Sequence, residues 1–138
     1  MERCIFCKIA AKNDPKTQIL YEDNEFVVFK DIKPAATHHY LVITKVHIKD
    51  PKQLNGGHID LVEKMVAVGY RILEDKHADV QNSRFGFHWP PFTSVQHLHL
   101  HAISPTTEMG FIGKGIFSPN SFWFVTVCHL LILVCNGI

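Results

Sequence analysis

A strict alternation of histidine with apolar residues constrains the fold more than any other part of this 138-residue sequence. Residues 97–102 read His-Leu-His-Leu-His-Ala. Successive side chains of a β-strand point to opposite faces, so the histidines share one face and the apolar residues share the other. The pattern predicts a strand over His97–Ile103 that buries its leucines. Its three imidazoles, rooted roughly 7 Å apart by the rise of a strand, would line an open face.

The remaining hydrophobic patterns predict the elements around this strand. A short helix is expected over Cys4–Lys12, a β-hairpin within Gln18–Lys30, and a strand over His39–Val46. Apolar residues recur at helical spacing over Ile59–Lys76, and a weaker strand signal covers Asn82–Phe87. This order of elements predicts an α+β fold with a mostly antiparallel, five-stranded sheet, one long helix and one short helix.

Composition limits the number of domains and the class of partner. A chain of 138 residues with 46% hydrophobic residues fits one domain with its own core. Lys and Arg total 14 against 13 Asp and Glu, without a basic block, which argues against a nucleic-acid partner. The first residues are charged and lack the long apolar stretch of a secretory signal. A cytoplasmic protein is therefore expected, with the nucleus left open as a second location.

The last 17 residues, Phe122–Ile138, carry no formal charge. This stretch is short for a membrane span, so we expect a buried strand or a packed terminal segment and no membrane partner. Its high β-propensity would make it prone to aggregation if it were left uncovered.

The histidine run admits three chemical interpretations. The imidazoles could occupy a solvated strand face without further role. A His-x-His pair on a strand is also good ligand geometry for zinc. Alternatively, one imidazole could act as a nucleophile towards phosphorus or carbon. Cys4 and Cys7 form a Cys-x-x-Cys pair, which in a reducing setting is more typical of metal or thiol chemistry than of a disulfide.

A family resemblance extends well beyond the histidines. The segments CIFCKIA, FKDIKPAATHHYLVITKVHI and GFHWPPFTSVQHLHLHAISP, in that order between Cys4 and Ser104, resemble the histidine triad superfamily of nucleotide hydrolases and transferases. The resemblance implies a histidine-triad fold over residues 1–124, followed by an atypical apolar tail at 125–138. Pro91–Ser94 stands where the better-known type 1 branch has a glycine-rich phosphate loop.

The resemblance also implies an activity and its catalytic residues. The activity is hydrolysis of adenosine 5′-monophosphoramidates, and of aminoacyl-adenylates, through a covalent nucleotidyl-histidine. The middle histidine, His99, would be the nucleophile, with His97 and His101 on either side of it. His39 matches the fourth histidine of the family, and Ser94 matches a serine that contacts the phosphate or the departing amine.

The same resemblance assigns a nucleotide site. Asp31 would hold the ribose hydroxyls. The alternative is that Asp31 is only a turn residue before Pro34. The apolar walls around the base would be Ile32, Phe29, Phe6, Ile5, Ile9 and Leu41. For these apolar positions, ordinary core packing explains the sequence equally well.

Some relatives complete a structural zinc site with residues that match Cys4, Cys7, His47 and His97 here. Packing of the two cysteines as small hydrophobic residues is the alternative. Catalysis itself is expected to need no cofactor. Purine nucleotides and a homodimer or larger homo-oligomer are the expected partners. Two other functions stay open: hydrolysis of dinucleoside polyphosphates, and a non-catalytic adaptor that binds nucleotide or metal.

Overall fold

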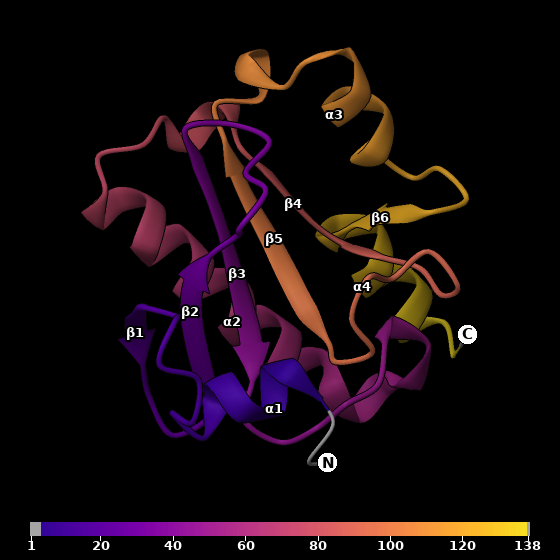
Figure 1. The fold of residues 1–138 in the computed structure, drawn as a ribbon. Helices are drawn as coiled ribbons and strands as arrows, with labels where there is room; N and C mark the ends of the chain where they lie inside the picture. Colours follow the sequence, from indigo (N-terminus) through magenta and orange to yellow (C-terminus); the bar gives the residue numbers. More distant parts are fainter. Residues whose placement is uncertain (1–3, 138) are drawn as a thin grey trace.

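An antiparallel sheet organises residues 4–137, the part of the chain that the computed structural model describes (Figure 1). The strands lie in the order β1-β2-β3-β5-β4-β6. Their bounds are β1 Ile19–Glu22, β2 Phe26–Lys30, β3 His38–Thr44, β4 Arg84–His88, β5 His99–Ser104 and β6 Phe124–Thr126. The predicted α+β class with an antiparallel sheet is confirmed. The predicted number of strands is wrong, because residues 4–137 form six rather than five.

The long amphipathic helix is confirmed as α2, Ile59–Asp75, and it lies behind the sheet (Figure 1). Its apolar stripe packs against β3 and β5, and this interface is the main core. Gly69 lies in this stripe, and a larger residue would not fit there because its Cβ would lie 2.6 Å from the ring of Phe85. The Phe85 ring also stacks on Tyr70, with centroids 4.4 Å apart.

The predicted alternation along β5 is present, and it separates two kinds of environment. Leu98, Leu100 and Ala102 are buried in the core beneath α2. His99 and His101 lie on the opposite face, which α1, Ile5–Ala10, covers near one end of β3 (Figure 1). The strand itself begins at His99, so the first histidine of the run precedes it.

The uncharged C-terminal stretch is packed, as expected, but mostly as a helix. It forms β6, which pairs with β4, and then α4, Val127–Cys135, which packs on α2. The boundary suggested between residues 124 and 125 falls inside β6, and Val125, Leu130 and Val134 belong to the main core. Between residues 4 and 137, no helix is both long and apolar enough to cross a membrane.

Short helices occupy the connections. They are η1 Pro51–Gln53, η2 Gly56–His58, η3 Val80–Asn82, η4 Thr106–Glu108 and α3 Phe111–Ile116. The last of these matters for the site, because the segment that follows β5 turns back over the histidine face. Phe117, one residue after α3, lies with its ring centroid 5.0 Å from that of His101.

Candidate active site

A cleft of about 930 Å³ opens beside the histidine run. Most of the residues that the sequence assigns to catalysis or nucleotide binding line it, namely His99, His101, Ser94, Asp31, Ile32, Phe29, Phe6, Ile5, Ile9 and Leu41. Two others do not: His39 and His97 are fully buried behind the wall. The fold therefore gathers residues from α1, β2, β3 and β5 around one cavity.

The histidine face is not open, contrary to the expectation from the strand pattern. His97 is 0% exposed, His101 5% and His99 6%. The edge of the Phe6 ring lies against His99, with centroids 5.1 Å apart, and Phe117 covers His101. The imidazoles are enclosed by α1 and by the segment after α3, which are distant in the sequence. The alternation of residues along one strand cannot show which distant segments will cover its faces.

The ring of His99 is held by the backbone of His97. Its Nδ1 lies 2.7 Å from the His97 carbonyl oxygen. A carbonyl oxygen only accepts hydrogen bonds, so Nδ1 of His99 carries the proton and Nε2 keeps a free lone pair. Burial lowers the pKa of His99 to about 4, so the imidazole is neutral near pH 7. A neutral imidazole with an unprotonated Nε2 is a competent nucleophile.

His39 and His101 form a second ordered pair. The backbone N–H of Ala35 donates to Nδ1 of His39 at 2.9 Å. The proton of His39 is therefore on Nε2, which donates to Nδ1 of His101 at 2.9 Å. Burial lowers the pKa of His39 to about 4, and it lowers the pKa of His101 well below its usual value. Both rings are neutral at pH 7, and the proton of His101 is left for its Nε2.

A fifth histidine, His88, extends this row of hydrogen-bonded imidazoles, and no role was predicted for it from the sequence. Its Nδ1 lies 3.3 Å from Nε2 of His101, and its Nε2 lies 3.1 Å from the carbonyl oxygen of Ile116. One signal was available in principle. In the β4–β5 pairing Gly86 lies opposite His101, so the residue two further along β4 shares the histidine face. That inference requires the strand pairing, which the sequence pattern does not supply.

Asp31 is a turn residue and also lines the cleft. Its Oδ1 accepts the backbone N–H of Lys33 at 2.8 Å, as expected of a turn residue. Its Oδ2 lies 3.3 Å from Nε2 of His39 and 4.0 Å from Nδ1 of His101. Burial raises the pKa of this carboxyl. The two interpretations left open from the sequence are therefore compatible in one side chain.

The apolar residues assigned to the base divide into two kinds. Phe6, Ile9, Phe29 and Leu41 are buried together in one cluster between α1 and the sheet. Each also lines the cleft, so packing and cavity wall are the same surface for these residues. In contrast, Ile5 and Ile32 are 43% and 90% exposed at the cleft.

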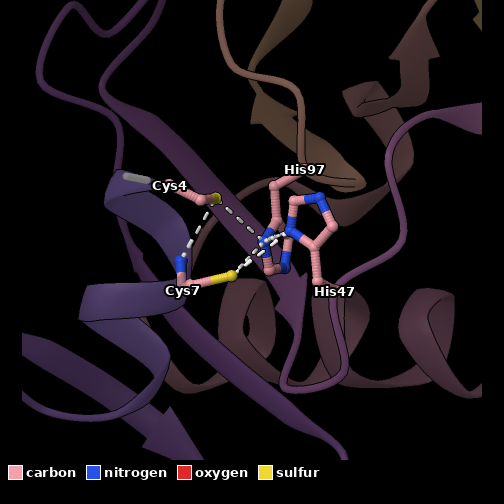
Figure 2. A group of neighbouring side chains, drawn as sticks. All are labelled: Cys4, Cys7, His47 and His97. Atoms are coloured by element: carbon pink, nitrogen blue, oxygen red, sulfur yellow. Dashed lines mark hydrogen bonds between the residues drawn. The ribbon is translucent and has the colours of Figure 1, made fainter. Parts of the chain in front are cut away.

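Cys4, Cys7, His47 and His97 converge at the N-terminal end of α1 (Figure 2). Nδ1 of His97 lies 3.3 Å from Sγ of Cys4, 3.5 Å from Sγ of Cys7 and 3.2 Å from Nδ1 of His47. Sγ of Cys7 also lies 3.2 Å from Nδ1 of His47. One ligand atom of each residue thus lies within 4.8 Å of the others, a group that could hold a metal ion.

The chemistry of this group fits a metal. Nε2 of His97 donates to the carbonyl oxygen of Thr44 at 2.7 Å, so Nδ1 of His97 lacks a proton and points its lone pair at the group. A hydrogen bond on the far nitrogen is the usual way in which a ligating histidine is oriented. Two thiolates and two imidazoles are a common tetrahedral ligand set for zinc.

Comparison with known proteins identifies the family. Residues 3–116 match the family described as "Scavenger mRNA decapping enzyme C-term binding". The chain is 52% identical over 130 residues to adenosine 5′-monophosphoramidase HINT3 of Mus musculus, covering 93% of this chain and 79% of the mouse protein.

Solved structures of histidine triad proteins have a similar fold. A HIT family hydrolase from Clostridium thermocellum has a TM-score of 0.69 and 31% identity, covering 75% of this chain and 90% of that chain. A zinc-bound histidine triad family protein from Mycobacterium smegmatis has a TM-score of 0.62 and 30% identity, covering 80% and 81%. The matched region contains the buried histidine run and the cleft beside it, and the chain belongs to the histidine triad family.

Proposed function

We propose that this chain hydrolyses adenosine 5′-monophosphoramidates through a covalent nucleotidyl intermediate on His99. The observation that carries the proposal is the hydrogen bond from Nδ1 of His99 to the carbonyl oxygen of His97, which leaves Nε2 unprotonated in a neutral ring. The name of the mouse relative, adenosine 5′-monophosphoramidase, supports the substrate class.

The reaction takes two displacements at phosphorus. In the first, Nε2 of His99 attacks the α-phosphorus, the P–N bond to the amine breaks, and the departing amine takes up a proton from solvent. In the second, water attacks the same phosphorus, the Nε2–P bond breaks, AMP is released, and the proton lost by the water returns to solvent. Splitting one difficult displacement into two easier ones is the general advantage of a covalent intermediate.

Two side chains at the wall would assist these steps. His101 carries its proton on Nε2, 3.3 Å from Nδ1 of His88, and if a phosphoryl oxygen replaced His88 as its acceptor, this N–H would stabilise charge that develops in the transition state. Ser94 lines the same cleft and is exposed there, where its hydroxyl can contact the phosphate or the departing amine.

The nucleoside would occupy the part of the cleft between α1 and β2. Asp31 would accept hydrogen bonds from the ribose hydroxyls, and a charged acceptor makes these bonds short and strong. The apolar walls contributed by Phe6, Ile9 and Leu41 would hold the base. This arrangement favours a nucleotide over a simple phosphoramidate.

We also propose that Cys4, Cys7, His47 and His97 bind a structural zinc ion. The unprotonated Nδ1 of His97 and the mutual distances of the ligand atoms support this assignment. When bound, the ion would supply a cross-link among α1, the segment after β3 and the segment before β5. His97 would then keep its backbone carbonyl in place under His99.

The test is steady-state hydrolysis of a fluorogenic adenosine phosphoramidate by the purified chain and by His99→Ala. Loss of the nucleophile should lower kcat/KM by at least about a thousandfold. His129→Ala, at an exposed position of α4, is the matched control and should leave the rate unchanged. A wild-type chain that binds AMP but turns nothing over would instead support the adaptor function.

A further inference from the structure

We propose that a second cavity, separate from the active-site cleft, binds a single-chain amphiphile with an anionic head group, such as a medium-chain fatty acid. The cavity has a volume of about 500 Å³ and shares no lining residue with the cleft. It lies between α4, η1 and the connections that follow β4 and precede β6 (Figure 1). The inference does not depend on the proposed hydrolysis.

Apolar side chains form most of the cavity wall. One side consists of Leu130, Leu133 and Val134 of α4, and the other side includes Pro51 and Pro90. Leu130 and Val134 also belong to the main core, so this side of the wall is anchored before any ligand arrives. A preformed, mostly apolar hollow of roughly 300–1,000 Å³ is typical of small-molecule sites.

Two aromatic residues complete the apolar lining. Trp89 is half-buried, and its backbone N–H donates to the carbonyl oxygen of Trp123 at 2.9 Å, which holds it beside the cavity. Phe122 is 88% exposed although it lines the same cavity. An alkyl chain in the cavity would remove apolar surface of both rings from water, and this burial is favourable.

The charge of the cavity selects the head group. Lys52 is the only charged residue in the lining, and among residues 4–137 no carboxylate forms an ion pair with its ammonium. Ser121, the other polar residue of the lining, already donates its hydroxyl to the carbonyl oxygen of Ser118 at 3.0 Å. An anionic head would therefore meet one ammonium and no opposing charge, whereas a cationic head would be repelled.

Calorimetric titration with alkyl probes below their micelle-forming concentrations tests both properties of the ligand. Decanoate should bind about tenfold more tightly than octanoate, because it buries two more methylene groups. Decylammonium should bind about three- to tenfold more weakly than decanoate, because its head meets Lys52 with like charge. Equal affinities for decanoate and decylammonium would contradict an anionic ligand.

Two substitutions in the lining place the binding in this cavity. Leu133→Trp fills the hollow and should weaken decanoate binding by at least about tenfold. Ile132→Trp, at the adjacent position that is 57% exposed, is the matched control and should bind as the wild type does. Lys52→Gln should weaken decanoate binding about two- to fivefold, the value of an exposed charge pair. Lys114→Gln, exposed on α3, is its control.

Thermal denaturation checks that each variant is folded, and Lys52→Gln keeps the test valid if Leu133→Trp does not fold. Fluorescence gives an independent location, because the chain contains only two tryptophans. In Trp123→Phe, the remaining emission of Trp89 should shift to shorter wavelength as decanoate covers the ring.

The proposal is overturned if decanoate does not saturate the protein, or if folded Leu133→Trp binds it as tightly as the wild type does. A second copy of the chain is the competing occupant. Self-association in sedimentation velocity that Leu133→Trp abolishes, without any decanoate binding, would assign the cavity to a contact between copies and would contradict the amphiphile site.

Discussion

The backbone of His97 holds the ring of His99 through a 2.7 Å hydrogen bond, while the ring of His97 itself belongs to the group formed with Cys4, Cys7 and His47. His97 thus links the proposed nucleophile, His99, to the candidate metal site. A disturbance of the metal ligands should reach His99 through one peptide carbonyl, without any change in the cleft.

Cys7→Ser should reveal this link. Loss of one thiolate should weaken zinc binding by at least about tenfold, lower the thermal midpoint, and reduce kcat as the His97 carbonyl loses its support. Zinc content by elemental analysis, thermal denaturation and steady-state kinetics measure the three effects. Cys128→Ser, at an exposed position of α4, is the control. Equal zinc content in Cys7→Ser and wild type would remove Cys7 from the ligand set.

Asp31→Asn should separate nucleotide affinity from local structure. The amide oxygen of asparagine can still accept the N–H of Lys33, so the turn is preserved. The lost charge should weaken AMP binding by roughly ten- to a hundredfold, the value of a hydrogen bond to a charged group. Calorimetric titration with AMP measures the change. Asp60→Asn, exposed on α2, should bind as the wild type does, and an unchanged affinity in Asp31→Asn would exclude a ribose contact.

Gly86→Ala should detach β6 from the sheet. A Cβ at Gly86 would overlap the carbonyl oxygen of Val125 and lie 2.5 Å from the ring of Phe124. Because a backbone atom cannot move aside cheaply, we expect a loss of about 1–3 kcal/mol in the free energy of unfolding. Gly56→Ala, where a Cβ would meet nothing within 4 Å, is the matched control. Urea unfolding compares the two, and equal midpoints would show that β6 can shift to accept the methyl group.

The buried histidines should make the protein sensitive to mild acid. His39 has a folded pKa of about 4, below the ordinary 6.5. Above pH 6.5 the ring is neutral in both states and contributes no pH dependence. As the pH falls from 6.5 to 4, His39 binds a proton in the unfolded state but not in the folded state, so the free energy of unfolding decreases.

For this one ring the slope is about 1.4 kcal/mol per pH unit. Urea unfolding at several pH values across that window measures it. His39→Gln should show a smaller slope than wild type, whereas His129→Gln, at an exposed position, should not differ from wild type. Parallel pH profiles for His39→Gln and wild type would contradict the buried neutral state.

The local periodicity of hydrophobic residues predicts much of the fold. The alternation around Leu100 and the helical spacing over Ile59–Lys76 are repeated signals that tertiary packing reinforces, and both elements were predicted from them. The stretch after Phe122 has neither period, because nearly every residue in it is apolar. Its division into β6 and α4 depends on the free edge of β4 and on the surface of α2, which are products of the fold.

The site divides in the same way. Residues that line the cleft could be named from the resemblance, because each lies in a contiguous motif such as FKDIKP. The proton order along His39, His101 and His88 could not, because it depends on which nitrogen meets which backbone group. Such contacts join residues up to 62 positions apart and become visible only in three dimensions.

The six-residue length of α1 has a consequence for how the nucleotide site is assembled. A helix this short does not persist by itself in water, so the wall formed by Phe6 and Ile9 depends on what anchors it. Besides the sheet residues that pack on Phe6 and Ile9, the helix meets His47 and His97, which are synthesised 40 and 93 residues after the cysteines that they contact. The wall of the proposed base pocket is thus the first part of the site to leave the ribosome, and these histidine contacts cannot form until His97 has followed it. If the proposed zinc ion is bound there, metal supply during synthesis would affect how many chains assemble this wall.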